Sequence, residues 1–292
     1  MSDVSDWWRT KIIQMEPGKI AFRGRSIEEL IESQSFTDMI WLMVMGFPAS
    51  NAQARLLDAA LVASVDHGPQ APSIAASRMA MTCGVGINNA IASGVNMLGD
   101  VHGGAGEQAL ELFQAIQRQS QQMPLDEAIA TMLSQLTDQG VTFVPGFGHR
   151  FHKPEDPRAR PLMDVLRACA AQDSAIDGQF SEIAEGLQDA IEHIKGRRIA
   201  MNIDGATAAI YGALGVPPTL ARGLFCLSRS VGLTPHLALA IIAHAAGFQN
   251  SCIKICHGTI ELSLITNCDI ARRCNTNCLR HVFLTKPMLG NP

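Results

Sequence analysis

Three short segments of the chain place chemically active side chains beside glycines. In the first, His102 precedes Gly103 and Gly104 at the start of a predicted helix. The positive end of a helix disfavours protonation of an imidazole, so His102 can stay neutral and donate a hydrogen bond to a substrate oxygen. The glycines let a ligand approach the backbone closely. A plain loop histidine is the alternative interpretation of this segment.

The second segment, residues 144–158, combines glycines, a histidine and several cations. Such a set suits an anionic ligand that has a carbonyl group to polarise, and His149 is the candidate for that task. Arg158 has a planar guanidinium that can pair bidentately with a carboxylate. The alternative is an exposed basic turn.

The third segment contains Asp204, which stands before a run of small residues. An aspartate at this place can cap the N-terminus of the following helix. It can also act as a general base held near a ligand. The segment alone leaves both roles open.

The elements that must position these residues are predicted to be mainly helices. Apolar residues make up 47% of the 292 residues and aromatic residues only 5%, a mixture that favours helix packing over sheets. Ser26 and Ser35 are predicted to cap helices, the second of which ends at Gly46. Short strands are expected only near 19–22 and 141–144. Further helices are predicted at 50–65, 73–97, 104–121, 125–139, 158–171, 178–194, 205–214 and 218–246.

Composition and charge restrict the class of protein. The net charge of −4 does not indicate a nucleic-acid surface, and the basic run 195–198 is either a solvated turn or a site for a small polyanion. The N-terminus lacks a secretory signal pattern, and the most apolar stretch, 233–248, is short for a membrane span. We therefore expect a soluble, cytoplasmic protein. The cysteines and histidines of 252–281 do not follow a usual zinc spacing.

Taken together and in this order, the three segments resemble the citrate synthase family. The matching patterns are His-Gly-Gly-Ala from His102, Pro-Gly-Phe-Gly-His-Arg from Pro145 with its closing Asp-Pro-Arg, and Asn-Ile-Asp ending at Asp204. The resemblance covers about residues 10–240. Weaker matches support it at 18–24, 66–73 and 228–232.

The resemblance implies a mainly α-helical fold in which the active site lies in a cleft between a large and a small helical domain. The large domain would comprise 1–123 and a return helix at 226–250, and the small domain 124–225. Residues 251–292 would form an atypical C-terminal tail. A homodimer is implied as well, because the family completes its site from the partner subunit.

The resemblance also implies the roles of the site residues. Asp204 would remove a methyl proton from acetyl-CoA, His102 would hydrogen-bond the thioester oxygen, and His149 would polarise the keto oxygen of oxaloacetate. The dicarboxylate would be held by His67, Arg158 and Arg229. The coenzyme A pocket would be lined by Pro145, Gly146, Phe147 and Gly148. Neither a metal nor a permanently bound cofactor is expected, since the coenzyme A thioester is a substrate.

Three departures from the family pattern guide the choice of function. The chain is shorter than citrate synthases between Pro48 and Asp66, Gly205 stands where they usually have Phe, and their C-terminal arm with its arginine is not recognisable after Asn250. The first two features resemble the citryl-CoA lyase branch, so we expect a lyase that makes or breaks citryl-CoA. Alternatives are a citrate or 2-methylcitrate synthase of the tricarboxylic acid cycle type and, from another class, a non-catalytic acyl-CoA-binding or regulatory subunit. Reaction direction and acyl chain stay open.

Overall fold

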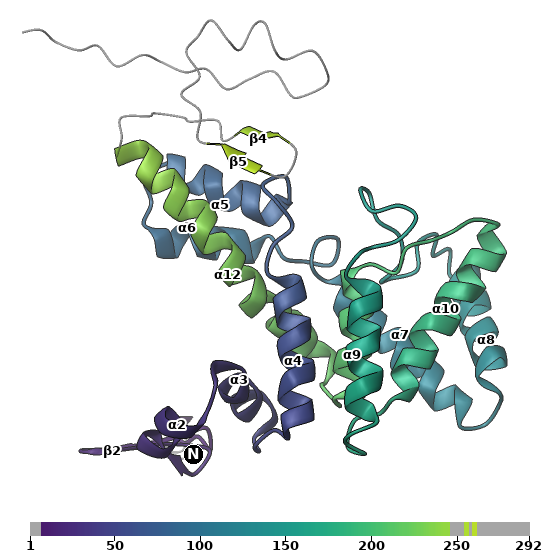
Figure 1. Cartoon of the computed structure of the whole chain (residues 1–292), viewed down its shortest axis with the longest axis horizontal. Helices are drawn as coiled ribbons and strands as arrows, with labels where there is room; N and C mark the ends of the chain where they lie inside the picture. Colours follow the sequence, from purple (N-terminus) through teal and green to yellow (C-terminus); the bar gives the residue numbers. More distant parts are fainter. Residues whose placement is uncertain (1–6, 246–253, 257–258, 262–292) are drawn as a thin grey trace, which may run out of the picture. The chain divides into compact units, whose positions relative to one another are not determined.

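The computed structural model describes residues 7–245, 254–256 and 259–261. The chain divides into two compact units (Figure 1). The first unit consists of Met1–Asp66 and Leu98–Arg229, and the second of His67–Met97 and Ser230–Pro292. Within the first unit, a small antiparallel sheet is formed by β1 (Ile13–Glu16), β2 (Lys19–Phe22) and β3 (Arg25–Ser26), in that order.

Local capping interactions begin and end the helices that follow this sheet. The Ser26 side chain accepts a hydrogen bond at the start of α2 (Ile27–Ser33), as predicted. Ser35 and Asp38 form a reciprocal capping box at the start of α3 (Phe36–Met45), and Gly46 ends it in the left-handed conformation with φ 86°. Helix α4 (Asn51–Ser64) begins with a second capping box.

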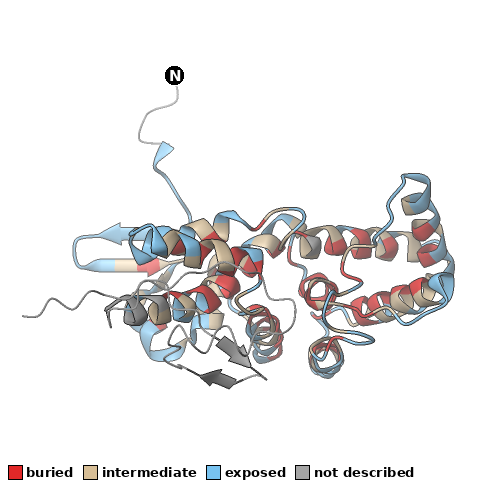
Figure 2. Ribbon diagram, turned by 90° about the horizontal axis from the view of Figure 1, so that it is seen from above, coloured by how far each residue is buried: buried red, intermediate tan, exposed pale blue. Residues whose placement is uncertain are grey.

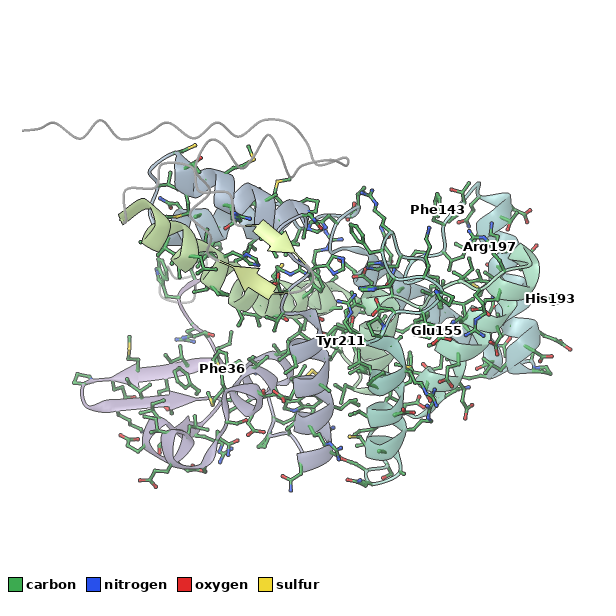
Figure 3. The ribbon with its side chains drawn as sticks, turned by 45° about the horizontal axis from the view of Figure 1, so that its top comes forward. Phe36, Phe143, Glu155, His193, Arg197 and Tyr211 are labelled. Atoms are coloured by element: carbon green, nitrogen blue, oxygen red, sulfur yellow. The ribbon has the colours of Figure 1, made fainter. Side chains whose placement is uncertain are left out.

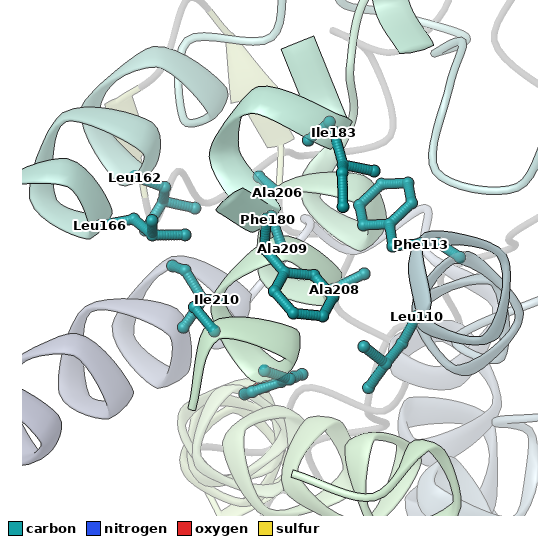
Figure 4. Close-up of a cluster of buried hydrophobic side chains, with 14 of the residues drawn as sticks. Leu110, Phe113, Leu162, Leu166, Phe180, Ile183, Ala206, Ala208, Ala209 and Ile210 are labelled. Atoms are coloured by element: carbon teal, nitrogen blue, oxygen red, sulfur yellow. The ribbon is translucent and has the colours of Figure 1, made fainter. Parts of the chain in front are cut away.

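The core of the first unit is built around α11 (Ile203–Ala213). Apart from Asp204, every residue of this helix is buried, as expected for a helix that is apolar on all sides. Figure 4 shows its alanines packed against Phe180 and neighbouring aliphatic side chains, and Figure 2 shows buried residues as stripes along the surrounding helices. These helices are α7 (Ala105–Ser120), α8 (Leu125–Asp138), α9 (Ala159–Ala170) and α10 (Gln179–Lys195).

The second unit contains α5 (Pro72–Thr82), α6 (Ile87–Asn96) and the later part of α12 (Pro218–Ala245). These helices approach closely at Gly94, where a Cβ atom would lie 2.8 Å from the Ser73 carbonyl oxygen and 2.9 Å from Leu233. A short hairpin of β4 (Lys254–Cys256) and β5 (Thr259–Glu261) belongs to the same unit. No helix of the described residues is long and apolar enough to cross a membrane.

Three secondary-structure predictions were wrong. Strands were expected only near 19–22 and 141–144, but β1 and β3 pair with β2 on either side, because the turns at Gly18 and Gly24 fold the chain back on itself. The single helix expected at 73–97 is two helices, because the chain turns at Gly84 with φ 78° between α5 and α6. Residues 141–144 form no strand; Val141 instead donates to the Leu136 carbonyl and closes the end of α8. The fold class is otherwise confirmed as mainly helical.

The predicted domain boundaries, 1–123, 124–225 and 226–250, do not coincide with the two units. The units divide at 66, 97 and 229, since the helices on both sides of residue 123 share the core around α11. The family-based boundaries therefore stay a prediction. The atypical tail, 251–292, lies largely outside the described residues, and so do the cysteine and histidine ligands weighed there.

Packing around α11 predicts opposite effects for two glycine-to-alanine substitutions. A Cβ atom on Gly212 would lie 2.3 Å from the ring of buried Phe180, whereas one on Gly223, exposed on α12, would have nothing within 4 Å. Gly212→Ala should therefore lower stability by about 1–3 kcal/mol through overpacking. Gly223→Ala should be neutral or add up to about 1 kcal/mol through helix propensity. Thermal unfolding followed by circular dichroism measures both, and equal effects would contradict this account of the core.

Candidate active site

Asp204 lies in the first turn of α11 but does not cap it. The N-cap is Asn202, whose Oδ1 accepts hydrogen bonds from the backbone N–H groups of Asp204 at 2.9 Å and Gly205 at 3.2 Å. Among the described residues, the Asp204 carboxylate accepts no hydrogen bond of its own. The structure thus decides against the capping role that the sequence left open.

The surroundings of Asp204 suit a group that accepts and returns a proton. The side chain keeps some solvent exposure but is densely surrounded by protein, and this burial raises its pKa to about 6. The charges of Arg158 and Arg229 lower the pKa, and that of Asp156 raises it. A Cβ atom on Gly106, in the first turn of α7, would lie 3.7 Å from Asp204 Oδ1, so the carboxylate faces the positive end of that helix. A base with a pKa near the working pH is efficient in proton transfer.

A backbone pairing fixes the His149 loop against the Asp204 turn. Gly148 N–H donates to the Ala200 carbonyl at 2.7 Å, and Asn202 N–H donates to the Gly146 carbonyl at 3.0 Å. The Asn202 side chain adds a third bond, from Nδ2 to the Gly148 carbonyl at 2.9 Å. Phe143 and Glu155, labelled in Figure 3, precede and follow this loop in the sequence. Asp204 and His149, the candidate base and the candidate hydrogen-bond donor, are therefore held by one pairing.

The His149 ring is oriented by its own loop. Nδ1 accepts hydrogen bonds from the N–H groups of Phe151 at 3.0 Å and His152 at 2.9 Å. Burial lowers the pKa of His149, the charges of His152 and Arg158 lower it further, and Asp156 opposes them. With Nδ1 an acceptor, the neutral ring carries its proton on Nε2. His149 is thus a neutral hydrogen-bond donor.

Arg158 is held beside His149 by Asp156. Arg158 Nε donates to Asp156 Oδ1 at 2.9 Å and Nη2 to Oδ2 at 2.8 Å, so the planar fork that we expected on a substrate carboxylate is on Asp156. Burial opposes ionisation of Asp156, but the hydrogen bonds from Arg158 outweigh it and hold the pKa of Asp156 below its usual value. Only Nη1, 3.5 Å from the Ala63 carbonyl, points away from this pair.

His149, His152 and Asp156 could also hold a cation, since one donor atom of each lies within 4.8 Å of the others. Both Asp156 oxygens already accept from Arg158, whose charge would repel a metal ion. We interpret the group as part of an anion site, and the expectation of no metal stays a prediction.

His102 lies in a tight turn before α7. Its backbone exchanges two hydrogen bonds with Gly99, at 2.8 and 3.0 Å. Burial lowers the pKa of His102, and the positive charge of Arg229 lowers it further. Both effects favour the neutral ring, and the role of His102 towards a thioester oxygen stays a prediction.

Arg158 and Arg229 converge on the C-terminal end of α4. Arg229 Nη2 donates to the Ser64 carbonyl at 3.4 Å, and its neighbour Ser228 donates to the Leu61 carbonyl at 2.5 Å. Arg229 is only 2% exposed, and its guanidinium lies 4.9 Å from the Phe225 ring centroid. Burial lowers the pKa of Arg229, Asp66 and Asp204 raise it, and Arg158 lowers it. An additional anion would stabilise this pair of cations.

The first unit thus brings five of the predicted residues into one electrostatic group: His102, His149, Arg158, Asp204 and Arg229. His67 belongs to the second unit, so its place beside the arginines stays a prediction. In the segment predicted for coenzyme A, Pro145 and Gly148 keep some exposure, whereas Gly146 and Phe147 are buried and Phe147 packs on Phe113. Sequence reasoning missed Asn202, although an Asn two residues before a helical Asp is a common N-cap pattern.

The family follows from comparison with known proteins. Residues 46–245 match the family described as "Citrate synthase, C-terminal domain". The chain belongs to the citrate synthase family. Citrate synthase 1 of Mycobacterium tuberculosis is 31% identical over 204 residues, which are 66% of this chain and 46% of that protein. The chain therefore spans about half the length of the curated relative.

Solved structures agree with this membership. The structure of citryl-CoA lyase from Hydrogenobacter thermophilus aligns with a TM-score of 0.70 and 30% identity, covering 80% of this chain and 87% of that one. Citrate synthase from Thermoplasma acidophilum, solved with carboxymethyl coenzyme A and oxaloacetate, aligns with a TM-score of 0.61 at 22% identity, covering 81% of this chain and 60% of that one. The second likeness shows the fold alone.

The raised pKa of Asp204 predicts a pH-dependent cost to stability. Well below pH 3.8 the carboxyl is protonated in both the folded and unfolded states, and it does not contribute. As pH rises from the ordinary value of 3.8 to about 6, the unfolded chain ionises first, so folding loses stability and the loss is complete above 6. Asp204→Asn should remove this cost and gain up to about 3 kcal/mol at pH 8, with a gain that shrinks towards pH 4.

Urea unfolding of both proteins between pH 4 and 8 measures the difference. Asp173→Asn is a control of opposite sign, since hydrogen bonds from Ser50 and Ala175 lower the pKa of Asp173. A stability difference for Asp204→Asn that does not change with pH would show that the Asp204 pKa is not raised.

Proposed function

We propose that this chain is an enzyme of the citryl-CoA lyase type, which cleaves or forms the carbon–carbon bond between an acetyl-CoA enol and oxaloacetate. The observation that carries the proposal is the grouping of a carboxyl with a pKa of about 6, two neutral imidazoles and two cations within one unit. This set matches the needs of enol chemistry: a base, two hydrogen-bond donors for oxygen atoms that gain charge, and cations for a dicarboxylate.

In the direction of bond formation, the Asp204 carboxylate takes a proton from the methyl group of acetyl-CoA. His102 donates a hydrogen bond to the thioester oxygen and stabilises the enol. The enol carbon attacks the keto carbon of oxaloacetate, whose oxygen is polarised by a hydrogen bond from the Nε2–H of His149. This oxygen takes up a proton from water as it becomes the hydroxyl of citryl-CoA, and Asp204 releases the methyl proton to water. Arg229 and the outer nitrogen of Arg158 would hold the carboxylates.

Cleavage uses the same atoms in reverse. The Nε2–H of His149 hydrogen-bonds the hydroxyl oxygen of citryl-CoA as the hydroxyl proton leaves to water. The carbon–carbon bond then breaks, and protonated Asp204 returns a proton to the enol carbon. With a pKa of about 6, Asp204 can hold or release this proton near neutral pH, which serves both directions.

The lyase hypothesis is supported by the likeness to citryl-CoA lyase from Hydrogenobacter thermophilus, since the alignment covers 87% of that lyase chain. A citrate synthase is the second candidate, supported by the curated relatives. A synthase must also hydrolyse the citryl thioester. A non-catalytic acyl-CoA-binding subunit would not need the Asp204 carboxyl. We also propose acetyl-CoA or citryl-CoA and oxaloacetate as partners, a homodimer as the assembly and the cytoplasm as the location.

The proposed chemistry predicts a specific defect in Asp204→Asn. Asn has the shape of Asp but cannot accept the methyl proton, so citryl-CoA cleavage and exchange of acetyl-CoA methyl protons with deuterium should both fall to background. In the unmutated enzyme, kcat/KM for bond formation should fall about tenfold per pH unit below pH 6, because protonated Asp204 is not a base.

Coenzyme A release and proton NMR measure the two reactions. Binding of coenzyme A to Asp204→Asn, measured by calorimetry, is the control for an intact site and should be unchanged. Citryl-CoA cleavage that yields acetyl-CoA and oxaloacetate identifies a lyase, and citrate with free coenzyme A identifies a synthase. Wild-type exchange rates in the Asn variant would refute Asp204 as the base, and no turnover by the unmutated protein would favour the binding subunit.

The arginine pair predicts separable effects on dicarboxylate binding. Arg229→Gln removes a buried cation and should weaken oxaloacetate binding by about 2–5 kcal/mol. Arg158→Lys should weaken it too, and should also destabilise the fold, because it breaks the bidentate pair with the buried Asp156. Coenzyme A affinity should change little in either variant.

Calorimetry with oxaloacetate and coenzyme A titrated separately tests this, with thermal unfolding as the measure of stability. Arg25→Gln is the matched control, since Arg25 pairs with Glu29 at the surface near the small sheet. Unchanged oxaloacetate affinity in both site variants would place the dicarboxylate elsewhere.

A further inference from the structure

One face of α12 supports the turn that presents His102. Arg222, Phe225 and Arg229 follow one another at helical spacing and so lie on the same side of the helix. Phe225 lies against Gly103, where a Cβ atom would be 3.1 Å from the Phe225 ring. The positive charge of Arg229 lowers the pKa of His102. Arg222 completes this face, and the proposed chemistry does not use it.

Arg222 bridges two carboxylates that stand on either side of His102 in the sequence. Its Nη2 donates to Asp100 Oδ1 at 2.6 Å, and its Nε lies 2.8 Å from Glu107 Oε2. Asp100 is part of the Gly99–His102 turn, and Glu107 is in the first turn of α7. The guanidinium therefore joins the turn that carries His102 to the helix that follows it.

The backbone beneath this bridge has no room for larger side chains. A Cβ atom on Gly104 would lie 2.9 Å from Arg222 Nη2 and 2.7 Å from the Gly99 carbonyl. At Gly103 the chain has φ 86°, and a Cβ atom would be 2.9 Å from Leu98. Arg222 thus lies directly over the backbone on the C-terminal side of His102, where a shift of the guanidinium would be transmitted to the imidazole.

The bridge is poorly placed to stabilise the whole fold. The Asp100 side chain is 73% exposed and that of Arg222 is 31% exposed, so this half of the bridge contributes about 0–1 kcal/mol, whereas the Glu107 side chain is only 19% exposed. Its geometry nevertheless restricts the segment 99–104. The exposed pair with Asp100 is therefore better explained by its position on the His102 turn than by its contribution to stability.

We infer that Arg222 is a positioning residue for His102, acting through Asp100 and Glu107. The inference rests on the proposed function for its catalytic consequence, but not for its structural one. Without the bridge, the turn should sample positions in which the His102 ring no longer meets the thioester oxygen, and it should become more exposed to water.

The experiment compares Arg222→Gln and Arg222→Lys with the unmutated enzyme. Arg222→Gln should lower kcat about 10- to 100-fold, as expected for a misplaced catalytic group, and leave the Kd for oxaloacetate unchanged. Arg222→Lys keeps one positive charge between the carboxylates and should recover part of kcat. Arg167→Gln is the matched control, since Arg167 also joins two carboxylates, Asp164 and Glu185, on the surface of α9 and α10.

A second readout does not depend on activity. The pKa of His102, followed by NMR and assigned by the signal missing from His102→Gln, should rise towards its ordinary value in Arg222→Gln because the ring loses its burial. It should not change in Arg167→Gln. If kcat and the His102 titration in Arg222→Gln match the unmutated protein, the inference is wrong.

The two readouts separate the inference from the proposed function. A shifted His102 titration in a protein that does not turn over citryl-CoA supports the positioning role and refutes the function. A normal titration with lowered kcat refutes the positioning role, since Arg222 would then act on catalysis by another route.

Discussion

The site depends on a pairing of a few backbone groups between residues 146–148 and 200–202. These hydrogen bonds join two segments that are about fifty residues apart in sequence, and each segment leads directly into a candidate catalytic residue. His149 follows one side of the pairing and Asp204 the other. Because backbone groups make most of the contacts, the relative position of Asp204 and His149 depends little on flexible side chains. Asn202 alone adds a side chain, which both caps α11 and donates to the Gly148 carbonyl.

Burial around this frame favours the uncharged forms of the two imidazoles and of the Asp204 carboxyl. Burial lowers the pKa of His102 and His149 and raises that of Asp204, since each change favours the uncharged form. Arg229 lowers the pKa of His102 and Arg158 that of His149, while both arginines moderate the rise at Asp204. The same cations that would hold a dicarboxylate therefore also keep the histidines as neutral donors. The two arginines thus link the proposed dicarboxylate binding to the protonation states of the histidines, in addition to the effect of burial.

Sequence reasoning was sufficient where the signal is local. The caps at Ser26 and Ser35, the left-handed end at Gly46 and the motifs around His102 and Asp204 could all be read from neighbouring residues. It failed at the turn near Gly84, where apolar spacing continues through a break in the helix. The pairing of Arg158 with Asp156 in place of a ligand, and the bridge made by Arg222, depend on side-chain geometry and long-range packing that periodicity does not encode.

Gly205, which follows Asp204, controls how closely the segment 146–148 approaches α11. Gly205 stands where citrate synthases usually have Phe, and a Cβ atom there would lie 2.5 Å from the Gly146 carbonyl oxygen. The reciprocal contact is as close, because a Cβ atom on Gly146 would lie 2.7 Å from Gly205 Cα. Any larger residue at 205 requires the loop 146–148 to move away from α11, and His149 would move with it. In this chain the absence of a side chain at 205 thus permits the short separation of the two segments, and with it the spacing between His149 and Asp204, the proposed hydrogen-bond donor and the proposed base.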